Sequence, residues 1–443
     1  MKILFATYSY NVQGGIEVWL DTLTRFLSAN GWDVTTALAR GSRFNIPERY
    51  RAQWPEHRYV ELDGLTGTNE GRIRAVTRAV EDERPDIVVA VTLGHALAAV
   101  GRMKGRGFPV RLVMPVHATN TQVLEEAMAF APVLDRCVGV NALHVEALIH
   151  HGFSRERTAT VVNGATPPRA VAPRVREPGS TLRILFAGRV HDETKRVFDL
   201  PEISRELQRR DVPFTFTVAG DGPDLPQLRD RLDAGFLGWV DQDRLRNEVL
   251  PQHDVLLVTS PPLGEAGPPL VALEAMSAGT VPVTSEFVGV HAPGSIRDGE
   301  TALLFDCGNA SQAAERLEAL YRDDALWKRL SDASRARAAA FTLDESLRKW
   351  DAVLRSVGDD APLRPAIDVA FPLSERDRES GRLEKVGLPP VTIDAFRRLA
   401  RRFPQFDDAW GEWPGTLAPA SDRFTIDELA ALDRHLAKSS VLA

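Results

Sequence analysis

Cysteine is almost absent from this chain of 443 residues. Only Cys137 and Cys307 occur, far apart and without the spacing of a zinc site. The sequence therefore indicates neither a disulfide framework nor a cysteine-ligated metal. We expect a protein of a reducing compartment, the cytoplasm.

Long apolar runs are also missing. The longest, from residue 87 to residue 100, is shorter than a membrane span and contains Gly94 and His95, so it predicts a buried strand that leads into a helix. The apolar run at residues 1–6 is too short for a signal peptide and predicts a first strand. We expect no transmembrane segment.

A basic excess is absent as well. The net charge of -7 at pH 7 argues against nucleic acid as the main partner. Locally, however, no acid occurs between Asp86 and Glu125, and basic residues gather near the end of one predicted helix: Arg102, Lys104, Arg106 and Arg111. They form either an ordinary solvated face or a surface for an anionic membrane or a phosphate-bearing acceptor, which would make the protein peripheral at the inner membrane face.

What the chain does contain is a repeated alternation of strands and helices. Apolar runs at residues 3–6, 34–38 and 87–91 alternate with helical patterns, which predicts an α/β domain with a parallel sheet over residues 1–165. A proline-rich linker, 166–181, precedes a second series, 182–343, with strands at 182–186, 214–218, 255–258 and 281–284. We predict two Rossmann-like domains whose strand ends face each other across a cleft.

A tail follows the second domain. The pattern at residues 344–357 predicts a helix that crosses back to the first domain, and residues 358–443 read as a linker plus short helices. Helices are expected to start at Thr392 and at Thr425, the second with Glu428 as a capping box. The aromatic residues between them either pack onto the main body or contact a protein or an acceptor: Phe403, Phe406, Trp410 and Trp413.

Candidate ligand-binding residues follow the predicted strands of the first domain. Gly14 and Gly15 precede the first helix and let the backbone approach a phosphate. No GxGxxG with a later acid is present, which counts against a nicotinamide enzyme. His117 ends another strand at the same edge, where ligand-facing groups collect. We expect the other nearby histidines to be surface or capping residues: His144, His150 and His151.

The second domain offers charged groups at equivalent places. Gly188 ends its first strand, and Arg189 and Lys195 bracket the next turn, where they could either hold a pyrophosphate or pair locally with Asp192 and Glu193. Gly220 ends the next strand in a tight turn. The DxD string at residues 241–243 directly precedes a helical pattern, so we assign it to helix capping rather than to a metal.

Residues 264–279 join a glycine and proline loop to an apolar helix that carries two acids, Glu265 and Glu274. A helix N-terminus, with Leu270 and Val271 in its first turn, is suited to an anionic or hydroxyl-rich ligand. Glu274 lies among apolar residues and needs a partner, which a sugar or ribose diol would supply. The alternative is a cap at Glu265 and a solvated acid at Glu274.

These features occur in one order along residues 1 to about 350: Gly14-Gly15 with Glu17, His117, Asn163-Gly164, Gly188-Arg189 with Lys195, Gly220-Asp221-Gly222-Pro223, and Glu274-Ala275-Met276. The set resembles the retaining GT-B glycosyltransferases of family 4. The resemblance implies a GT-B fold, a nucleotide-diphosphate sugar donor such as a UDP- or GDP-hexose, and no metal or other cofactor.

The resemblance also implies roles for individual residues. Arg189 and Lys195 would grip the donor diphosphate, Glu274 would bind the ribose, Glu265 the donor sugar, and His117 would lie near the reacting centre. The rest of the implied donor site consists of Gly14, Gly15, Gly188, Gly220, Gly267, Leu270 and Val271.

The chain departs from the family pattern at the first glutamate. Eight residues separate Glu265 from Glu274, where the family usually has seven, and Pro268 and Pro269 lack the N–H groups that the family loop offers. Either a one-residue bulge lets Glu265 take the role, which we favour, or the first acid is functionally absent.

Together these observations predict a retaining glycosyltransferase that moves a sugar to a hydroxyl acceptor. The acceptor would be a saccharide, a lipid-linked molecule or a small molecule, in surface polysaccharide, glycolipid or glycoside biosynthesis. The alternatives are a sugar-nucleotide epimerase or hydrolase on the same fold, and a non-catalytic nucleotide-sugar-binding protein.

Overall fold

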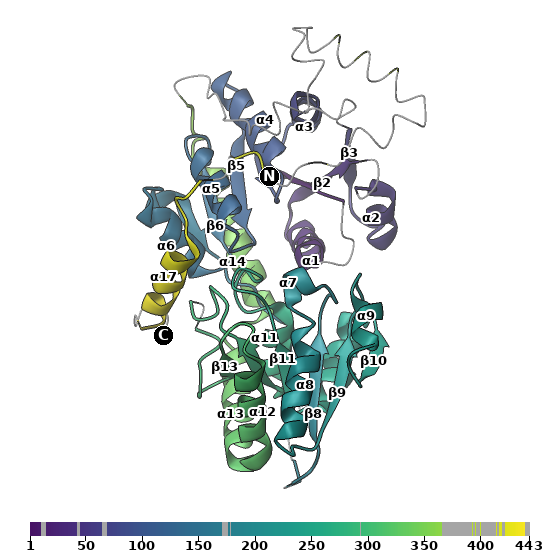
Figure 1. Ribbon diagram of the computed structural model, residues 1–443. Helices are drawn as coiled ribbons and strands as arrows, with labels where there is room; N and C mark the ends of the chain where they lie inside the picture. Colours follow the sequence, from purple (N-terminus) through teal and green to yellow (C-terminus); the bar gives the residue numbers. More distant parts are fainter. Residues whose placement is uncertain are drawn as a thin grey trace.

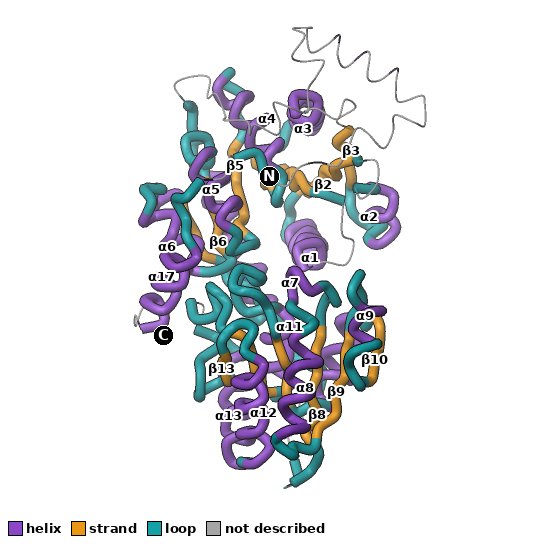
Figure 2. The backbone as a smooth tube through the Cα atoms, viewed as in Figure 1, coloured by secondary structure: helices purple, strands orange, loops and turns teal. Residues whose placement is uncertain are grey.

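A computed structural model describes most of the chain. The described residues are 1–9, 15–41, 45–63, 69–170, 176–177, 179–292 and 294–365, followed by 392, 395, 399, 413, 416–418 and 421–438. Figure 1 shows two halves, one above the other, and Figure 2 shows that strands are flanked by helices in both.

The first half is built on a parallel sheet of order β3-β2-β1-β4-β5-β6-β7. Its strands are β1 (Lys2–Thr7), β2 (Asp33–Arg40), β3 (Tyr59–Asp63), β4 (Ile87–Ala90), β5 (Arg111–Val116), β6 (Arg136–Gly139) and β7 (Thr158–Thr160). Its helices are α1 (Gly15–Ala29), α2 (Pro47–Gln53), α3 (Asn69–Glu83), α4 (Gly94–Gly105), α5 (Thr121–Ala129) and α6 (Ala142–His150), with a 3-10 turn at Arg155–Arg157.

The second half repeats the plan with the order β10-β9-β8-β11-β12-β13. Its strands are β8 (Leu182–Ala187), β9 (Phe214–Ala219), β10 (Gly235–Gly238), β11 (Val255–Val258), β12 (Val281–Ser285) and β13 (Leu303–Phe305). Its helices are α7 (Asp192–Lys195), α8 (Asp199–Arg209), α9 (Leu225–Arg229), α10 (Gln242–Arg244), α11 (Leu270–Ala278), α12 (Ala310–Arg322) and α13 (Asp324–Ala338), with a π-helical turn at Leu245–Val249 and a 3-10 turn at Leu250–Gln252. The predicted pair of Rossmann-like halves is confirmed.

The strands missed by the sequence reading are short edge or near-edge strands. β10 has glycine at two of its four positions and so lacks an apolar run, whereas β13 is an apolar run of only three residues, too short to stand out as a strand. Strands predicted from continuous apolar runs, such as β4 and β11, are fully buried. A sheet covered on both faces requires such runs.

One helix links the two halves. α14 (Leu343–Asp359) starts beside the second half, where Ala165 and Thr342 form a bridge, and packs Trp350, Leu354 and Val357 into the core under β1 and α1. Figure 1 shows this green helix entering the upper half. The first sheet is therefore covered on one face by α1 together with a segment more than 300 residues later in the chain.

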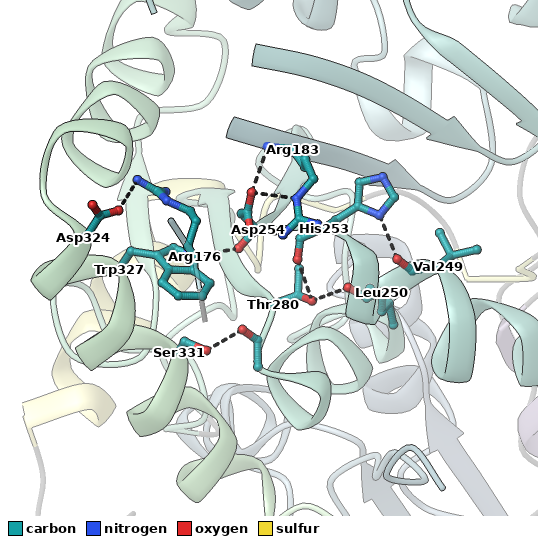
Figure 3. Close-up of polar contacts among 11 residues, drawn as sticks. Arg176, Arg183, Val249, Leu250, His253, Asp254, Thr280, Asp324, Trp327 and Ser331 are labelled. Carbon is teal, nitrogen blue, oxygen red and sulfur yellow. Dashed lines mark hydrogen bonds and ion pairs between the residues drawn. The ribbon is translucent and has the colours of Figure 1, made fainter. Parts of the chain in front are cut away.

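A polar network closes the amino end of the second sheet (Figure 3). Asp254 is fully buried and accepts from the Arg183 guanidinium at 2.7 and 3.1 Å and from the Arg183 backbone N–H at 3.0 Å. Trp327 Nε1 donates to the Asp254 carbonyl at 3.1 Å, and Thr280 Oγ1 donates to the Leu250 carbonyl at 2.6 Å. These bonds satisfy the charge of Asp254 at the end of the sheet that faces away from the other half.

The described part of the tail packs on the first half. The helix predicted at Thr425 is confirmed as α17 (Ile426–Lys438), and the Glu428 N–H donates to Thr425 Oγ1 at 3.2 Å. Trp413 is 5% exposed and donates from Nε1 to the Arg40 carbonyl at 2.9 Å, so its packing role is confirmed. Nearly all of the helix predicted at Thr392 lies outside the described residues, as do Phe403, Phe406 and Trp410.

Two surface predictions are wrong. Lys104 is 2% exposed, because its ammonium donates to the Val133 carbonyl at 2.8 Å and contacts Asp135, so it cannot belong to a membrane-facing patch. His144 is fully buried, with Nε2 3.1 Å from Thr119 Oγ1, rather than at the surface. Within the described residues, no helix has the length and hydropathy needed to cross a membrane.

Candidate donor-binding site

The predicted site residues lie at the carboxyl ends of the two sheets. Gly15 begins α1, and His117 directly follows β5 in the first half. Gly188 follows β8, Gly220 follows β9, and Glu265 lies in the loop before α11 in the second half. Gly14 falls outside the described residues, so its position stays a prediction.

Lys195 and Glu265 meet across the second half. Lys195 ends the single turn of α7, and its ammonium contacts Glu265 Oε1, which also accepts from Ser260 Oγ. The two charged side chains are 22% and 9% exposed. Lys195 pairs with Glu265 and not with Asp192 or Glu193 of its own turn. Asp192 instead accepts from the Phe198 N–H at 2.9 Å. The loop of Glu265 and the turn of Lys195 therefore form one charged unit.

Arg189 is exposed at the start of the same turn. No side-chain hydrogen bond or ion pair of its guanidinium occurs with any described residue, and Asp192 and Glu193 do not engage it. An unengaged guanidinium is available for an anion, which it can hold through two parallel N–H bonds.

Glu274 is a buried acid of the second half. It lies on α11 and is 6% exposed, yet no hydrogen bond or ion pair of its carboxylate occurs within the part of the chain that the structure describes. Burial raises the pKa of Glu274 to about 7, and the positive charge of Arg246 opposes this rise only in part. A buried carboxylate in this state is stabilised by any ligand that donates hydrogen bonds to it.

The glycines that follow β8 and β9 allow a close approach of backbone to backbone. A Cβ on Gly220 would lie 1.8 Å from the Gly188 carbonyl oxygen, and one on Gly222 would lie 2.2 Å from the Val190 carbonyl oxygen. Glycine is therefore required at both positions by the packing of the two turns. Their contribution to a ligand site is to bring these turns together.

The loop before α11 faces the first half. A Cβ on Gly267 would lie 3.0 Å from Asn141 Nδ2, so this loop abuts the N-cap of α6. Pro269 occupies the N-cap position of α11, which leaves the N–H groups of Leu270 and Val271 as the first donors of the helix. Both side chains are only partly buried.

His117 packs against an aromatic pair in the first half. Its ring lies 4.2 Å from the Trp19 ring, and Trp19 in turn lies 5.2 Å from Trp350. Burial and the neighbouring His144 lower the pKa of His117 to about 3, so the imidazole is neutral. Its Nε2 atom is buried and has no hydrogen-bond partner among the described residues.

Both acids of the DxD string have protein partners. Asp241 accepts from the Arg244 N–H at 2.9 Å and so caps α10, as predicted. Asp243 accepts from Arg169 at 2.9 Å. The only described metal-like group of acids and histidine, Asp21 with Glu56 and His57, already pairs with Arg25 and within itself.

Three residues near this site were missed by the sequence reading. Ser260 hydrogen-bonds Glu265, Asn141 touches the Glu265 loop from the other half, and Trp239 follows Gly238 at the end of β10 with 54% of its surface exposed. Trp239 carried no clear signal, because neither β10 nor the exposure of the indole can be read from the sequence. The other two are defined only by tertiary contacts.

Comparison with known proteins identifies the fold. Among solved structures, sucrose-phosphate synthase from Thermosynechococcus elongatus superposes with a TM-score of 0.64 at 17% identity, covering 80% of this chain and 98% of that one. HepE from Anabaena, solved with UDP-glucose, gives a TM-score of 0.61 at 19% identity over 80% and 100% of the two chains. This is a GT-B glycosyltransferase fold.

Sequence comparison gives a family match in the second half of the chain and one partial match to a curated relative. Residues 181–323 match the family model "Glycosyl transferases group 1". A D-inositol 3-phosphate glycosyltransferase from Streptomyces bingchenggensis is 29% identical over 214 residues. That match spans 45% of this chain and 45% of the relative, slightly less than half of either.

Proposed function

We propose that this protein is a retaining glycosyltransferase that moves a sugar from a nucleotide-diphosphate donor to a hydroxyl acceptor. The single observation that carries the proposal is the arrangement in the second half: the Lys195–Glu265 pair beside an exposed Arg189 and a buried Glu274, neither of which has a side-chain partner among the described residues. The family match of this half and the UDP-glucose bound by HepE support a nucleotide-sugar donor.

Each part of a donor would meet a group of matching chemistry. Arg189 and Lys195 supply positive charge for the diphosphate, with the free N–H groups at the start of α11 beside them. The unpartnered carboxylate of Glu274 would accept hydrogen bonds from the ribose hydroxyls. The exposed face of Trp239 would stack on the nucleotide base.

The sugar would lie between the two halves. Glu265, held by Lys195 and Ser260, would accept from its hydroxyls, which is the role expected if the extra residue before α11 is accommodated as a bulge. His117 is neutral, and its buried Nε2 has no partner in the part of the protein that the structure describes, so it can accept from or donate to a hydroxyl of the sugar.

The reaction would be driven mainly by charge stabilisation. The bond between the anomeric carbon and the diphosphate oxygen breaks, the acceptor oxygen bonds to that carbon from the same face, and the hydroxyl proton passes to the departing diphosphate. Arg189 and Lys195 stabilise the negative charge that develops on the leaving group, a term worth about 3 to 4 kcal/mol for a single donor in a preorganised site. No metal is required by this scheme.

We place the activity in surface polysaccharide, glycolipid or glycoside biosynthesis in the cytoplasm, with a saccharide, lipid-linked or small-molecule acceptor. Membrane contact through the basic cluster would rest on Arg102, Arg106 and Arg111 alone, since Lys104 is buried. Arg111 already donates to the Asp360 carbonyl at 2.7 and 3.0 Å.

A panel of nucleotide sugars, screened by thermal shift and then by calorimetry on the full chain, tests the donor. Product analysis with and without acceptor separates transfer from epimerisation or hydrolysis, and the anomeric configuration of the product tests retention. The absence of binding to any nucleotide sugar would contradict the proposal. Binding without turnover would favour the non-catalytic alternative.

The role of Glu265 has its own test. Glu265→Ala should lower turnover strongly while donor binding is retained through Arg189 and Glu274. Lys328→Ala is the control for the Lys195→Ala variant, because Lys328 also pairs with an acid but lies exposed on α13, where it contacts Asp332. If Lys195→Ala abolishes turnover and Glu265→Ala leaves it untouched, Glu265 does not act on the sugar.

A further inference from the structure

The tail helix α17 packs against the first half of the molecule. Phe424 and Leu429 are 3% and 0% exposed and belong to the core around α5 and α6. Glu428 Oε1 lies 2.8 Å from His151 Nε2 at the end of α6. Figure 1 shows α17, in yellow, alongside α6.

One acid of this helix points at the second half instead. Asp433 is 2% exposed, and its carboxylate accepts three backbone N–H groups of the loop that follows β12. The Gly289 and His291 N–H groups donate to Oδ2 at 2.9 and 3.3 Å, and the Ala292 N–H donates to Oδ1 at 2.8 Å. Three bonds to one buried carboxylate hold a loop firmly, because each bond is charge-assisted.

The same loop is held from the other side by the first half. Asn141 Nδ2 donates to the Gly289 carbonyl at 2.8 Å, and the Asn141 side-chain oxygen caps α6. Val288 and Ala292, 5% and 0% exposed, pack within the core of the first half. The loop of the second half is therefore enclosed between the start of α6 and the tail helix.

The enclosed loop is connected to the candidate site through Asn141. The Asn141 amide nitrogen is 3.0 Å from the Cβ positions of both Gly289 and Gly267. Gly267 is two residues beyond Glu265 in the loop that pairs with Lys195. A continuous set of contacts thus leads from Asp433 through Gly289 and Asn141 to the Glu265 loop.

We propose that Asp433 is a positioning residue, and that α17 acts as a clasp that holds loop 289–292 so that the two halves keep the arrangement in which Asn141 supports the Glu265 loop. Without the carboxylate, three buried N–H groups lose their acceptor, and the halves separate more readily at this edge. The catalytic consequence rests on the proposed function, whereas the clasp itself does not.

The test compares two full-length variants of the same helix. Asp433→Asn removes the charge and one acceptor from the loop, while Glu428→Gln alters a contact that stays within the first half. Hydrogen exchange at Gly289, His291 and Ala292 should become about tenfold faster in Asp433→Asn and stay unchanged in the control. The kcat should fall about tenfold in Asp433→Asn, with the donor Kd changed less than about twofold, because the groups proposed to bind the base, ribose and diphosphate lie in the second half.

Unchanged exchange and unchanged kcat in Asp433→Asn would overturn the proposal. If the whole tail loses protection in that variant, Gly289→Ala provides a second test. Gly289 has a φ of +96°, and a Cβ there would press on Asn141, so the clasp is strained without any change in α17. An unchanged kcat in Gly289→Ala would also overturn the proposal. Should the wild-type protein turn over no nucleotide sugar, the proposed function fails, and the exchange comparison still decides the clasp.

Discussion

The two ends of the second sheet differ in whether their charged side chains have protein partners. At the amino end, Asp254 is fully buried and bonded to Arg183 three times (Figure 3). At the carboxyl end, Glu274 is nearly as buried and has no partner among the described residues, and Arg189 is equally unengaged. The first end contributes to stability, whereas the second keeps polar groups available for a ligand at a cost in stability.

The largest effect is expected at the carboxyl end, for Lys195→Ala. It removes one of two cations that would stabilise the leaving diphosphate, so kcat should fall on the order of 10³-fold, or about 4 kcal/mol in activation free energy. The melting temperature should change little, because Lys195 is partly exposed and Glu265 keeps Ser260 as a partner. Steady-state kinetics and thermal denaturation measure the two quantities, and a loss of Tm in parallel with kcat would contradict the assigned role.

At the amino end, a substitution should lower stability and leave turnover unchanged. Arg183→Met removes both guanidinium hydrogen bonds of the buried Asp254 carboxylate, so the free energy of unfolding should fall by about 3 kcal/mol. Turnover measured well below the melting temperature should stay unchanged. Arg205→Met, which breaks an exposed pair on α8, serves as the control and should cost less than about 0.5 kcal/mol. Equal denaturation midpoints for the two variants would contradict the distinction.

Glu274→Gln should change both stability and donor binding, and the change in stability should depend on pH. Because the pKa of Glu274 rises to about 7 in the folded state, the wild-type protein loses stability as pH rises from about 4.5 through 7, where the unfolded chain releases the proton more readily. The variant lacks this loss and should be more stable at pH 8, by at most about 3 kcal/mol. At the same pH it should bind donor about tenfold more weakly, since a neutral acceptor replaces a charged one. Urea denaturation at pH 5 and pH 8 tests the gain in stability, and calorimetry at pH 8 tests the weaker donor binding.

The smallest effect is expected for Thr280→Val at the amino end. The buried hydroxyl of Thr280 donates to the Leu250 carbonyl at 2.6 Å, so its loss should cost about 1 kcal/mol of stability without altering kinetics. Chemical denaturation measures this change. A loss of donor binding in this variant would show that the two ends are coupled.

The sequence by itself determined the architecture. Continuous apolar strands such as β4 and β11, each followed by a helix, specify parallel sheets covered on both faces, since any other arrangement would leave those runs in water. The same reasoning identified Glu274 as an acid that needs a partner, because its position among apolar residues of a helix is visible in the one-dimensional pattern. The capping role of Asp241 and the start of α17 were local and therefore readable as well.

Only the tertiary structure decided the partners of the remaining groups. Lys195 pairs with Glu265 rather than with its sequence neighbours, Lys104 turns inward to Asp135, and Asp433 reaches a loop of the other half. Each of these contacts joins residues far apart in the chain, and the choice among acids of equal chemistry depends on distances that appear only when the sheets and the tail are packed. Charge and residue type set which contacts are favourable, and the packing of the two halves selects which ones form.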